Sequence, residues 1–480
     1  MTRRTKIVAT LGPVTDAPDA LDAVLRAGVD VARVNFSHGS AEEHAARIRR
    51  FREASARVGK FAAVLADLPG PKLRVKIPAE RILAFGDTVA FSLSATPDGS
   101  GDIVLTEPEI LADVRPGQRI LLDDGRLQLE AGDAVNGRLF ARVVVGGTLL
   151  PNKGLNLPDT PLTIPALTQR DRDAIAVAAV AGVDWVALSF VRGPDAAAEA
   201  RAALAAVGLK VPVMAKVERP EAVGRAAAIV AAFDGIMVAR GDLGVEIPLE
   251  RVPTVQKQLI AEARAAGKPV VTATDMLDSM RNNPRPTRAE ASDVANAIFD
   301  GTDAVMLSGE TAVGRYPVEA VACMARIAVE TESHLMKTGR AVELGFACPD
   351  DGGVDDPVTM AACGLATEVN AAALVVPTLS GRTARMVARH RPWAKVVAVA
   401  PTEAVLRGVA PVWGIHAVRM TPTAAGGDRM ATAVRDAYAA GAVKPGDHVV
   451  VTAGHPIEGG RRFPTIRVVR VGDGGSCGEP

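Results

Sequence analysis

The tetrapeptide Ala-Gly-Val-Asp occurs at residues 27–30 and again at residues 181–184, and Asp300-Gly-Thr-Asp303 is a variant of it. In each case an alanine-rich segment of helical character ends at the glycine, and a run of β-branched residues follows. Glycine just after a helix adopts the left-handed conformation that ends many helices. The motif therefore predicts a helix that is followed at once by a strand.

Similar β-branched runs alternate with alanine-rich stretches from the start of the chain to residue 308. The runs are Lys6–Gly12, Val29–Phe36, Ala62–Leu68, Val183–Phe190, Val211–Val217, Asp234–Val238, Pro269–Thr274 and Asp303–Ser308. This alternation is typical of parallel α/β sheets, and eight such units predict a closed (β/α)8 TIM barrel.

Two other regions lack this regular alternation of strand-like and alanine-rich segments. Residues 71–164 contain Gly, Pro and Asp turns between short alternating strands, including Arg126–Glu130 and Arg138–Val145, which predicts a small all-β domain inserted into a βα loop as a lid. Beyond residue 338, the candidate strands are Leu374–Pro377, Lys395–Ala400, His416–Met420, His448–Thr452 and Ile466–Val471. We expect a catalytic barrel at 1–70 and 165–338, a β-barrel lid at 71–164, and a C-terminal α/β regulatory domain at 339–480 that follows a linker at Asp350–Asp356.

Composition excludes several classes of function. The 480 residues contain 55 Lys and Arg and 55 Asp and Glu, so no overall field attracts the chain to nucleic acid or to a membrane. The four cysteines form no CxxC pair, and the basic N-terminus lacks the apolar core of a signal peptide. We expect a cytoplasmic protein with reduced thiols.

Polar residues stand at the carboxyl ends of seven of the eight predicted strands, where the catalytic residues of such barrels lie. In chain order they are Arg33, Asn35, Ser37, His38, Asp67, Ser189, Lys216, Glu218, Arg240, Asp242, Thr274, Ser308 and Glu310. The alternative is a structural ring of ion pairs, and a single Lys-x-Glu would favour it. Polar residues at so many strand ends favour a catalytic site.

The types of these residues indicate a metal and a phosphate. Carboxylates such as Glu218 and Asp242, without a His/Cys cluster, favour Mg²⁺ or Mn²⁺ over zinc. Lys216 and Arg33 add positive charge where phosphoryl oxygens would lie, and phosphoryl transfer depends on such neutralisation. The chain has no Walker-type loop and no protein-kinase Gly-rich loop, so a nucleotide would be held differently.

Several long motifs resemble those of pyruvate kinases, and the similarity extends over essentially the whole chain. They are Thr5-Lys-Ile-Val-Ala-Thr-Leu-Gly-Pro13, Asn35-Phe-Ser-His-Gly39, Met214-Ala-Lys-Val-Glu218, Met237-Val-Ala-Arg-Gly-Asp-Leu-Gly-Val-Glu246, Pro286-Thr-Arg-Ala-Glu290 and Met306-Leu-Ser-Gly-Glu-Thr311. The resemblance implies transfer of the phosphoryl group of phosphoenolpyruvate to ADP with Mg²⁺, giving pyruvate and ATP in the last step of glycolysis. It also implies a homotetramer.

The resemblance also implies roles for individual residues. Glu218 and Asp242 would bind Mg²⁺, the backbone from Ala239 to Gly241 would seat the substrate carboxylate, and Lys216 would stabilise the transferring phosphoryl group. The remaining roles are phosphate binding by Arg33, nucleotide contacts by Asn35, His38 and Arg74, and delivery of a proton to the enolate through Thr274, Ser308 and Glu310. Because a threonine hydroxyl is neutral at ordinary pH, a water-linked relay is more plausible than direct donation by Thr274.

Two positions depart from the family pattern. The common family segment Asp-Thr-Lys-Gly-Pro-Glu-Ile-Arg is here Asp67-Leu-Pro-Gly-Pro-Lys-Leu-Arg74. In potassium-dependent members that Glu accompanies a K⁺ site built from the positions of Asn35, Ser37, Asp67 and Leu68, so we expect Lys72 to replace K⁺; the alternative is a solvated lysine on the hinge. Asp275 stands where the family usually has Gln, and its effect on proton transfer is left open.

In the C-terminal domain, Ser380, Gly381, Arg382 and Thr383 follow a predicted strand and open a helix, where backbone N–H groups can bind phosphate. The resemblance implies an allosteric effector here, together with a loop at Gly454–Phe463; the alternative is an ordinary turn. Because Arg461-Arg-Phe-Pro replaces a Thr-Thr-Asn-like segment, a sugar phosphate and AMP are both open.

Two other functions compete with this interpretation. A phosphoenolpyruvate or pyruvate barrel of the aldolase or mutase type would lack the inserted β domain and the effector domain. A non-catalytic metabolite sensor would not be expected to retain Lys216, Glu218, Asp242, Thr274 and Ser308 together.

Overall fold

Eight parallel strands close into a barrel, and they coincide with the eight predicted runs. The computed structural model describes all residues except 1, 95–101, 339–354, 423–427, 458–460 and 480. Around the barrel the order is β1-β17-β16-β15-β14-β13-β3-β2. The strands are β1 (Lys6–Thr10), β2 (Val31–Asn35), β3 (Ala63–Asp67), β13 (Trp185–Leu188), β14 (Val213–Val217), β15 (Gly235–Ala239), β16 (Val270–Ala273) and β17 (Ala304–Leu307).

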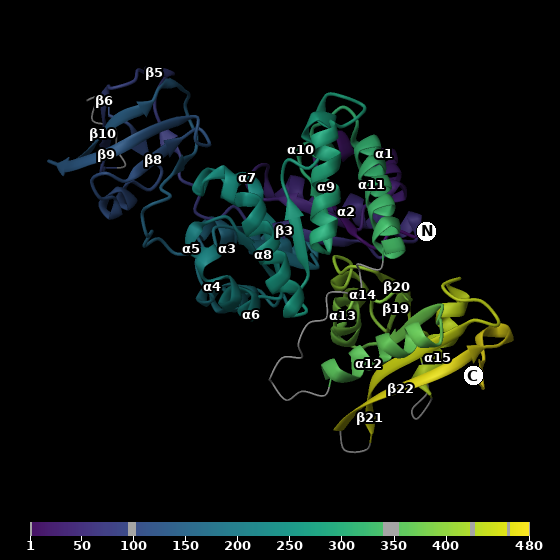
Figure 1. Ribbon diagram of the computed structural model, residues 1–480. Coiled ribbons are helices and arrows are strands. Elements are labelled where there is room, and N and C mark those ends of the chain that lie inside the picture. Colours follow the sequence, from purple (N-terminus) through teal and green to yellow (C-terminus); the bar gives the residue numbers. More distant parts are fainter. Residues whose placement is uncertain (1, 95–101, 339–354, 423–427, 458–460, 480) are drawn as a thin grey trace.

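Helices surround this barrel (Figure 1). Three of them end at the glycine of the Ala-Gly-Val-Asp motif or of its variant, and a strand begins directly after each motif. They are α1 (Pro18–Ala27), α2 (Ala41–Val58), α3 (Gln169–Ala181), α4 (Asp195–Ala206), α5 (Pro220–Gly224), α6 (Ala226–Ala232), α7 (Arg240–Glu246), α8 (Val252–Ala265), α9 (Arg288–Asp300), α10 (Gly309–Ala312) and α11 (Pro317–Thr338), with 3-10 turns at Pro13–Thr15, Leu249–Arg251 and Asp278–Arg281. Gly28, Gly182 and Gly301 cap α1, α3 and α9 with φ of 136°, 75° and 95°. Their positive φ confirms the role predicted for the glycine.

The aspartate of the motif has a second task, which the sequence did not indicate. Asp30 accepts a hydrogen bond from Ile7 N at 2.9 Å, Asp184 from Val64 N at 2.7 Å, and Asp303 from Val270 N at 3.1 Å. Each donor lies in the strand beside the one that the aspartate precedes. The carboxylates thus satisfy backbone N–H groups at the amino ends of the barrel strands, which would otherwise be buried without partners.

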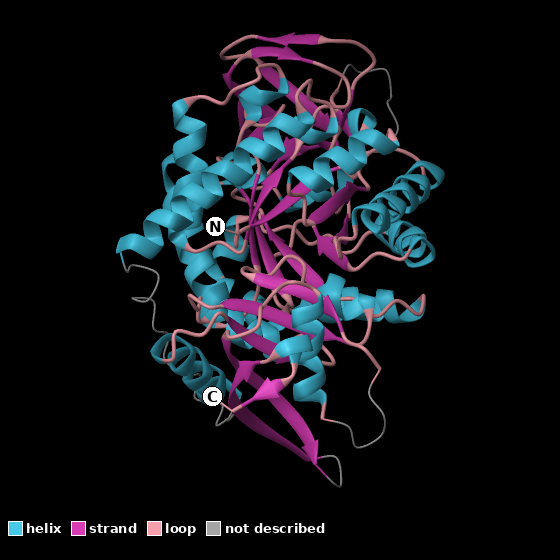
Figure 2. Cartoon of the chain, turned by 90° about the vertical axis from the view of Figure 1, so that its right-hand side faces the viewer, coloured by secondary structure: helices cyan, strands magenta, loops and turns pink. Residues whose placement is uncertain are grey.

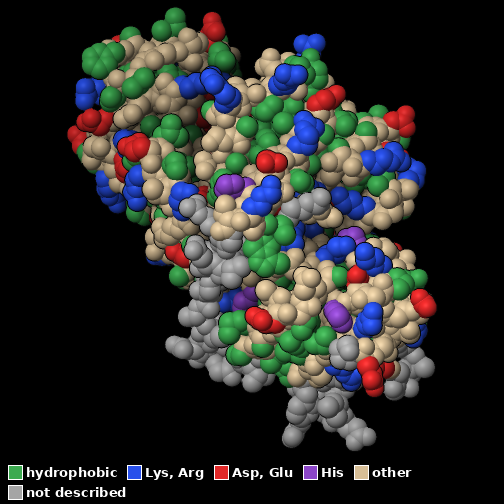
Figure 3. Space-filling view, turned by 45° about the vertical axis from the view of Figure 1, so that its right-hand side comes forward, with side chains coloured by type: hydrophobic (Ala, Val, Ile, Leu, Met, Phe, Trp, Pro, Cys, Tyr) green, Lys and Arg blue, Asp and Glu red, His purple; other side chains and the backbone are tan. Residues whose placement is uncertain are grey.

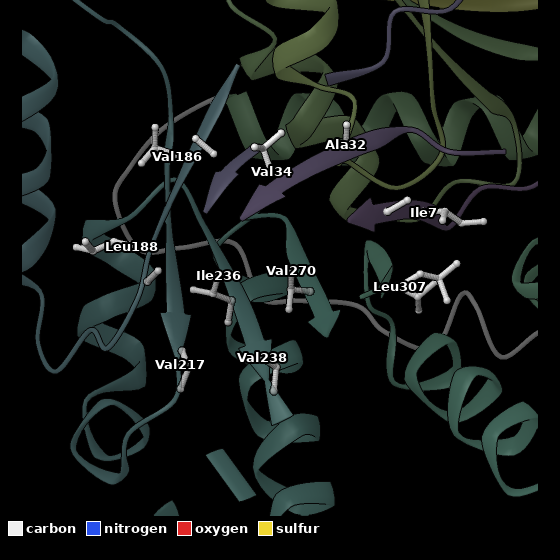
Figure 4. Packing of buried hydrophobic residues seen from close by; sticks show 14 of the residues in the cluster. Ile7, Ala32, Val34, Val186, Leu188, Val217, Ile236, Val238, Val270 and Leu307 are labelled. Atoms are coloured by element: carbon white, nitrogen blue, oxygen red, sulfur yellow. The ribbon is translucent and has the colours of Figure 1, made fainter. Parts of the chain in front are cut away.

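Alternating side chains of the barrel strands form two cores. Val8, Leu65, Trp185 and Met237 belong to the cluster that fills the interior of the barrel. Their strand neighbours, including Ile7, Val186, Ile236 and Leu307, belong to the layer between strands and helices, and Figure 4 shows this outer layer. Because every barrel strand is buried on both sides, the strands have the continuous apolar character that the sequence displays.

Asp30 provides a test of the network at the amino ends of the strands. Burial alone would raise the pKa of its carboxyl, but the charges of Arg3, Lys60 and Lys6 outweigh burial and lower the pKa well below its usual value. A depressed pKa stabilises the fold above the unfolded-state pKa of about 3.9, and this contribution is lost as pH falls below that value.

We therefore expect Asp30→Asn to lower the free energy of unfolding by about 3 kcal/mol at pH 7, because it breaks a buried ion pair. The difference in thermal midpoint between variant and wild type should shrink between pH 4 and pH 3. Asp22→Asn, which breaks the ion pair to the half-exposed Arg57, is the control with little expected effect. Equal midpoints of Asp30→Asn and wild type at pH 7 would contradict the assignment.

The segment between β3 and β13 forms a separate all-β domain beside the barrel, as predicted, and we refer to this domain as the lid (Figure 1). Its main sheet has five strands in the order β12-β8-β9-β10-β6, and β11 pairs with β5 and β4 with β7. The strands are β4 (Val75–Lys76), β5 (Arg81–Leu83), β6 (Thr88–Ser92), β7 (Val104–Leu105), β8 (Arg119–Leu122), β9 (Leu127–Val135), β10 (Arg138–Val145), β11 (Gly147–Leu149) and β12 (Leu155–Asn156), with a 3-10 turn at Pro108–Asp113. The lid has a core of its own, which includes Phe91 and Ile120.

A C-terminal α/β domain lies at the opposite end of the barrel from the lid (Figure 2). Its sheet order is β20-β19-β18-β21-β22-β23. The elements are α12 (Asp355–Glu368), β18 (Ala373–Pro377), α13 (Arg382–Arg389), β19 (Lys395–Ala400), α14 (Glu403–Gly408), β20 (Ile415–Arg419), α15 (Arg429–Ala439), β21 (His448–Ile457), β22 (Arg461–Val471), a 3-10 turn at Asp473–Gly475, and β23 (Cys477–Gly478). The linker prediction was wrong at its end, because α12 already begins at Asp355, where acidic residues favour a helix N-terminus; the part up to residue 354 lies outside the described residues.

The C-terminal domain touches the amino-terminal mouth of the barrel. Trp185 Nε1 donates to Gly408 O at 3.1 Å, Arg407 Nε lies 2.9 Å from Asp184 Oδ1, and Ala410 packs against the interior cluster of the barrel. These contacts leave the opposite, carboxyl-terminal mouth free for the lid.

The surface has mixed charge. On the face shown in Figure 3, Lys and Arg side chains are interspersed with Asp and Glu. Among the residues that the structure describes, no helix has the length and apolar character needed to span a membrane.

Candidate active site

Lys216 lies at the centre of the polar cluster at the carboxyl ends of the strands. Its ammonium is 2.8 Å from Glu218 Oε1 and 3.2 Å from Asp67 Oδ1, and it donates to Ser189 Oγ at 2.7 Å. Burial would lower the pKa of Lys216, but Asp67, Glu218 and Asp242 together outweigh burial and raise it. The ammonium is therefore charged at neutral pH and available to an anionic ligand.

Glu218 and Asp242 supply the carboxylate oxygens of the cluster. Glu218 is fully buried, and its Oε2 accepts a hydrogen bond from Phe190 N at 2.8 Å, while its Oε1 receives no well-directed hydrogen bond. Burial raises the pKa of Glu218 despite Lys216, and the charge of Asp242 raises it further. A divalent cation bound to these two carboxylates would offset their repulsion, so the donor set fits Mg²⁺ or Mn²⁺.

The protein offers few ligands for such a cation. No group of three or more His, Cys, Asp or Glu side chains suited to a metal occurs in the described part of the chain. Two carboxylates leave most positions of an octahedral ion to substrate oxygens and water, which is usual for magnesium in phosphoryl-transfer sites.

Arg33 joins the same cluster from β2. Its Nε lies 2.6 Å from Asp67 Oδ2, and its Nη1 donates to Thr10 Oγ1 at 2.9 Å. Asp67 therefore links the two cations, because its other oxygen faces Lys216. Asp67 thus holds the like-charged Arg33 and Lys216 close together, and the positive surface that they form suits an anionic group.

Thr274 lies at the end of β16, in a strained backbone. Its φ is 67° and that of Asp275 is 53°, both in the left-handed region that disfavours residues other than glycine. Thr274 Oγ1 accepts a hydrogen bond from Gly241 N at 2.7 Å, and Arg240 holds the loop through Thr274 O at 2.6 Å and Asp293 Oδ1 at 2.7 Å. Such strain is typical of functional sites, where neighbouring contacts hold the residue in place.

Ser308 and Glu310 stand at the end of β17. Glu310 is buried, and its carboxylate accepts hydrogen bonds from Ser308 N at 2.7 Å and Leu277 N at 3.1 Å; burial raises its pKa. Ser308 Oγ is inaccessible to solvent and makes no hydrogen bond with the residues that the structure describes. A buried hydroxyl without a partner is uncommon and indicates a ligand or water there.

Lys72, Arg74 and His38 lie where the lid joins the barrel. Burial, and then the charges of Arg74, Lys72, Arg170 and Arg33, lower the pKa of His38, so these cations surround one histidine. Lys72 lines a small cavity together with Asp242 and Asp124. Its ammonium forms neither a hydrogen bond nor an ion pair with the described residues, whereas Arg74 Nη1 donates to Asn152 O at 2.7 Å.

Four other residues are predicted to lie near a monovalent cation, and oxygen atoms among them already accept hydrogen bonds within the protein. Asn35 Oδ1 accepts a hydrogen bond from Ser37 N at 3.0 Å, and Leu68 O accepts one from Ser189 Oγ at 2.7 Å. Asp275, the other departure, has a side chain that reaches solvent. The protein around it still removes part of the water from its carboxyl, and this desolvation, followed by the charge of Asp278, raises its pKa.

The predicted effector loop is well separated from this cluster, in the C-terminal domain. Gly381 has a φ of 78° and precedes α13, and its N–H donates to Thr378 Oγ1 at 3.0 Å. Arg382 pairs with Asp355 at 3.1 Å, while Ser380 is exposed. Of the second predicted segment, residues 458–460 and the side chains from 454 to 463 lie outside the described residues.

Three further residues hold the cluster in place, and the sequence indicates two of them only as polar strand ends. Ser189 bridges Lys216 and Leu68, and Arg240 fixes the Thr274 loop. Arg219 is almost fully buried and pairs with Glu246. Ser189 and Arg240 could have been selected from their positions at strand ends, but the burial of Arg219 has no signal in the sequence.

The fold and the cluster define the class of protein: a (β/α)8-barrel enzyme with an inserted lid and a carboxylate-lysine centre at the carboxyl ends of its strands. A family model described as "Pyruvate kinase, barrel domain" matches residues 2–321, and one described as "Pyruvate kinase, alpha/beta domain" matches residues 356–469. The chain belongs to the pyruvate kinase family and is a phosphotransferase.

Similar curated proteins support this membership. A pyruvate kinase of Geobacillus stearothermophilus is 45% identical over 462 residues, which cover 95% of this chain and 78% of the relative. "Pyruvate kinase 2" of Synechocystis sp. is 44% identical over 94% of this chain and 76% of its own length. A pyruvate kinase of Agrobacterium vitis is 43% identical over 98% of this chain and 97% of its own length.

Proposed function

We propose that the chain transfers the phosphoryl group of phosphoenolpyruvate to ADP, producing pyruvate and ATP in the cytoplasm as the last step of glycolysis. The observation that carries this proposal is the charged Lys216 ammonium, held by Asp67, Glu218 and Ser189 at the mouth that the lid faces. Family membership supports the same reaction.

Lys216 and Arg33 stabilise the phosphoryl group during transfer, and Glu218 and Asp242 hold the Mg²⁺ or Mn²⁺. A divalent cation held there would neutralise negative charge on the substrate. The backbone from Ala239 to Gly241 seats the substrate carboxylate. Asn35, His38 and Arg74 face the nucleotide, where the cations around His38 favour its phosphates.

The other half of the site delivers a proton to the enolate carbon of pyruvate. Thr274 Oγ1 donates to Ala273 O at 2.6 Å and accepts from Gly241 N, so its position is fixed from both sides. Ser308 Oγ is free to bond an ordered water, and the buried Glu310 holds the backbone that carries Ser308. This arrangement suits a relay through water better than direct donation.

Potassium is not required in this proposal, because Lys72 supplies the monovalent positive charge beside Asn35, Ser37, Asp67 and Leu68. Lys72 and Asp242 line the same cavity, and the ammonium of Lys72 forms no ion pair with a described residue. The alternative, a solvated lysine on the hinge, predicts an ordinary requirement for K⁺.

Regulation and assembly form a further part of the proposal. A phosphorylated effector binds the backbone and side chains of Ser380, Gly381, Arg382 and Thr383, at the N-terminus of α13. Domains at residues 1–70 with 165–338, 71–164 and 339–480 act as catalytic barrel, lid and regulatory domain, in a homotetramer.

The reaction is tested by measuring pyruvate formation from phosphoenolpyruvate. Pyruvate should appear only with ADP and a divalent cation present together, should cease on addition of EDTA, and should resume with Mg²⁺ or Mn²⁺ in excess. ATP should form in equal amount. Absence of ADP-dependent pyruvate would overturn the proposal, and release of pyruvate with inorganic phosphate in the absence of ADP would indicate hydrolysis of the substrate instead.

A further inference from the structure

Arg219 directly follows Glu218 at the end of β14, and its side chain is only 3% exposed. Its guanidinium serves two carboxylates: Nη1 lies 2.9 Å from Glu246 Oε2, and Nη2 lies 2.9 Å from Glu221 Oε1. Nη2 also faces two carbonyl oxygens of the lid return segment, which we define as residues 156–160. These are Leu157 O at 3.2 Å and Thr160 O at 3.3 Å.

Glu246 completes the link from the other side. It lies on α7, the short helix that also carries Asp242, and its side chain is 1% exposed. Its Oε2 faces Arg219, and its Oε1 accepts a hydrogen bond from Asn156 Nδ2, in the lid, at 2.7 Å. One buried ion pair thus contacts the lid return segment at three of its residues.

The position of this pair connects the lid to both proposed metal ligands. Arg219 is adjacent in sequence to Glu218, and Glu246 lies one helical turn beyond Asp242. The small cavity between lid and barrel is lined from the lid side by Lys72, Asp124 and Asn156 and from the barrel side by Arg219, Asp242 and Glu246. A shift of the lid return segment would therefore change the shape of this cavity, which Asp242 also lines.

A buried ion pair is a poor means of stabilising a fold, because the cost of desolvating both charges offsets most of their attraction. The guanidinium here is a rigid fork with several donors, which suits it to fixing carbonyl groups in one orientation. The carbonyls of Leu157 and Thr160 belong to a chain segment that passes between two domains. These features indicate positioning rather than stabilisation.

We propose that the Arg219–Glu246 pair sets the position of the lid over the active site and thereby the binding of the nucleoside diphosphate. Arg219 is a positioning residue, since it acts through the lid return segment. The inference rests on the proposed function in one respect: ADP is held between the lid and the barrel, whereas phosphoenolpyruvate is held by barrel residues.

The test compares Arg219→Lys with Arg142→Lys. The latter alters an arginine–carboxylate pair within the lid, where Arg142 lies 3.2 Å from Glu130 on an exposed surface. Lysine keeps the charge opposite Glu246 but cannot serve the two carbonyls at once. We expect Arg219→Lys to raise the KM for ADP about tenfold and to change the KM for phosphoenolpyruvate less than twofold, because each lost hydrogen bond weakens binding severalfold. Arg142→Lys should leave both constants unchanged.

Asn156→Ala is a second variant that removes the lid contact of Glu246 but leaves the buried pair intact, so folding is not at risk. Asn156→Ala should also raise the KM for ADP, as Arg219→Lys does. The double variant should show less than the product of the two single effects, because both act through one contact region. Hydrogen exchange of backbone amides over residues 152–164 should be faster in Arg219→Lys and Asn156→Ala than in Arg142→Lys.

Three outcomes would overturn the proposal. They are unchanged constants for ADP in both variants, equal increases of both KM values together with a lower thermal midpoint, and unaltered exchange over residues 152–164. If wild-type protein shows no ADP-dependent pyruvate formation, the proposed reaction fails, while the exchange comparison still decides whether the pair positions the lid.

Discussion

Replacing Lys216 with methionine is expected to lower kcat by about a thousandfold, the usual cost of removing a preorganised group that stabilises transition-state charge. The ammonium lies within 3.2 Å of both Asp67 and Glu218, so its position is fixed before substrate binds. Methionine has a similar length but no charge, and the KM for phosphoenolpyruvate should rise by a smaller factor than kcat falls. Steady-state pyruvate formation measures both constants.

Two controls separate this effect from unfolding. Lys257→Met removes a lysine that pairs with Asp300 on the helical exterior of the barrel, far from the cluster, and should retain wild-type kcat. The thermal midpoint of Lys216→Met should rise on addition of Mg²⁺. Asp67 and Glu218 lose the lysine ammonium in this variant, and a bound Mg²⁺ would supply positive charge in its place. A kcat within tenfold of wild type would remove Lys216 from the proposed mechanism.

Replacing Lys72 with glutamate is expected to make the enzyme depend on potassium. Wild-type turnover should be equal in potassium and in choline buffers at matched ionic strength. The variant should lose about a hundredfold in choline, since an added carboxylate replaces a stabilising positive charge beside the site. Potassium should restore most of this loss, because the variant has the carboxylate that accompanies the K⁺ site in potassium-dependent members.

Lys76→Glu is the matched control for this change of charge, because Lys76 is an exposed residue of β4 in the same segment. It should behave like wild type in both buffers. A large loss of wild-type activity without potassium would end the hypothesis, and a loss in Lys72→Glu that potassium does not restore would show that Lys72 acts in another way.

The barrel could be predicted because its signals are local. Each Gly-Asp motif places a helix end and a strand start within four residues, and side-chain alternation then brings Lys216 and Glu218 to one face of β14. The clustering of strand ends follows from barrel closure, which is why Arg33 from β2 meets Asp67 from β3 and why Lys216 meets both Asp67 and Glu218.

Features that depend on distant partners could not be predicted. Nothing near Arg219 in the sequence indicates that it contacts carbonyls about sixty residues earlier or a carboxylate on the next βα unit. Thr272 is fully buried, and its hydroxyl donates to Thr302 Oγ1 at 3.0 Å, a partner thirty residues later in the chain. The left-handed backbone of Thr274 and Asp275 is imposed by Arg240 and other neighbours, against the preference of both residues.

The contact of the C-terminal domain with the amino-terminal mouth of the barrel has a consequence for how this architecture can be altered. Trp185 donates a hydrogen bond to Gly408 from inside the barrel, and Ala410 packs against the interior cluster. The C-terminal domain therefore closes the amino-terminal opening of the barrel. A chain cut after α11 would expose apolar surface that the intact protein never shows to solvent, and it should aggregate. We therefore expect a chain with an exchanged C-terminal domain to stay soluble only if the new domain also covers the opening around Trp185.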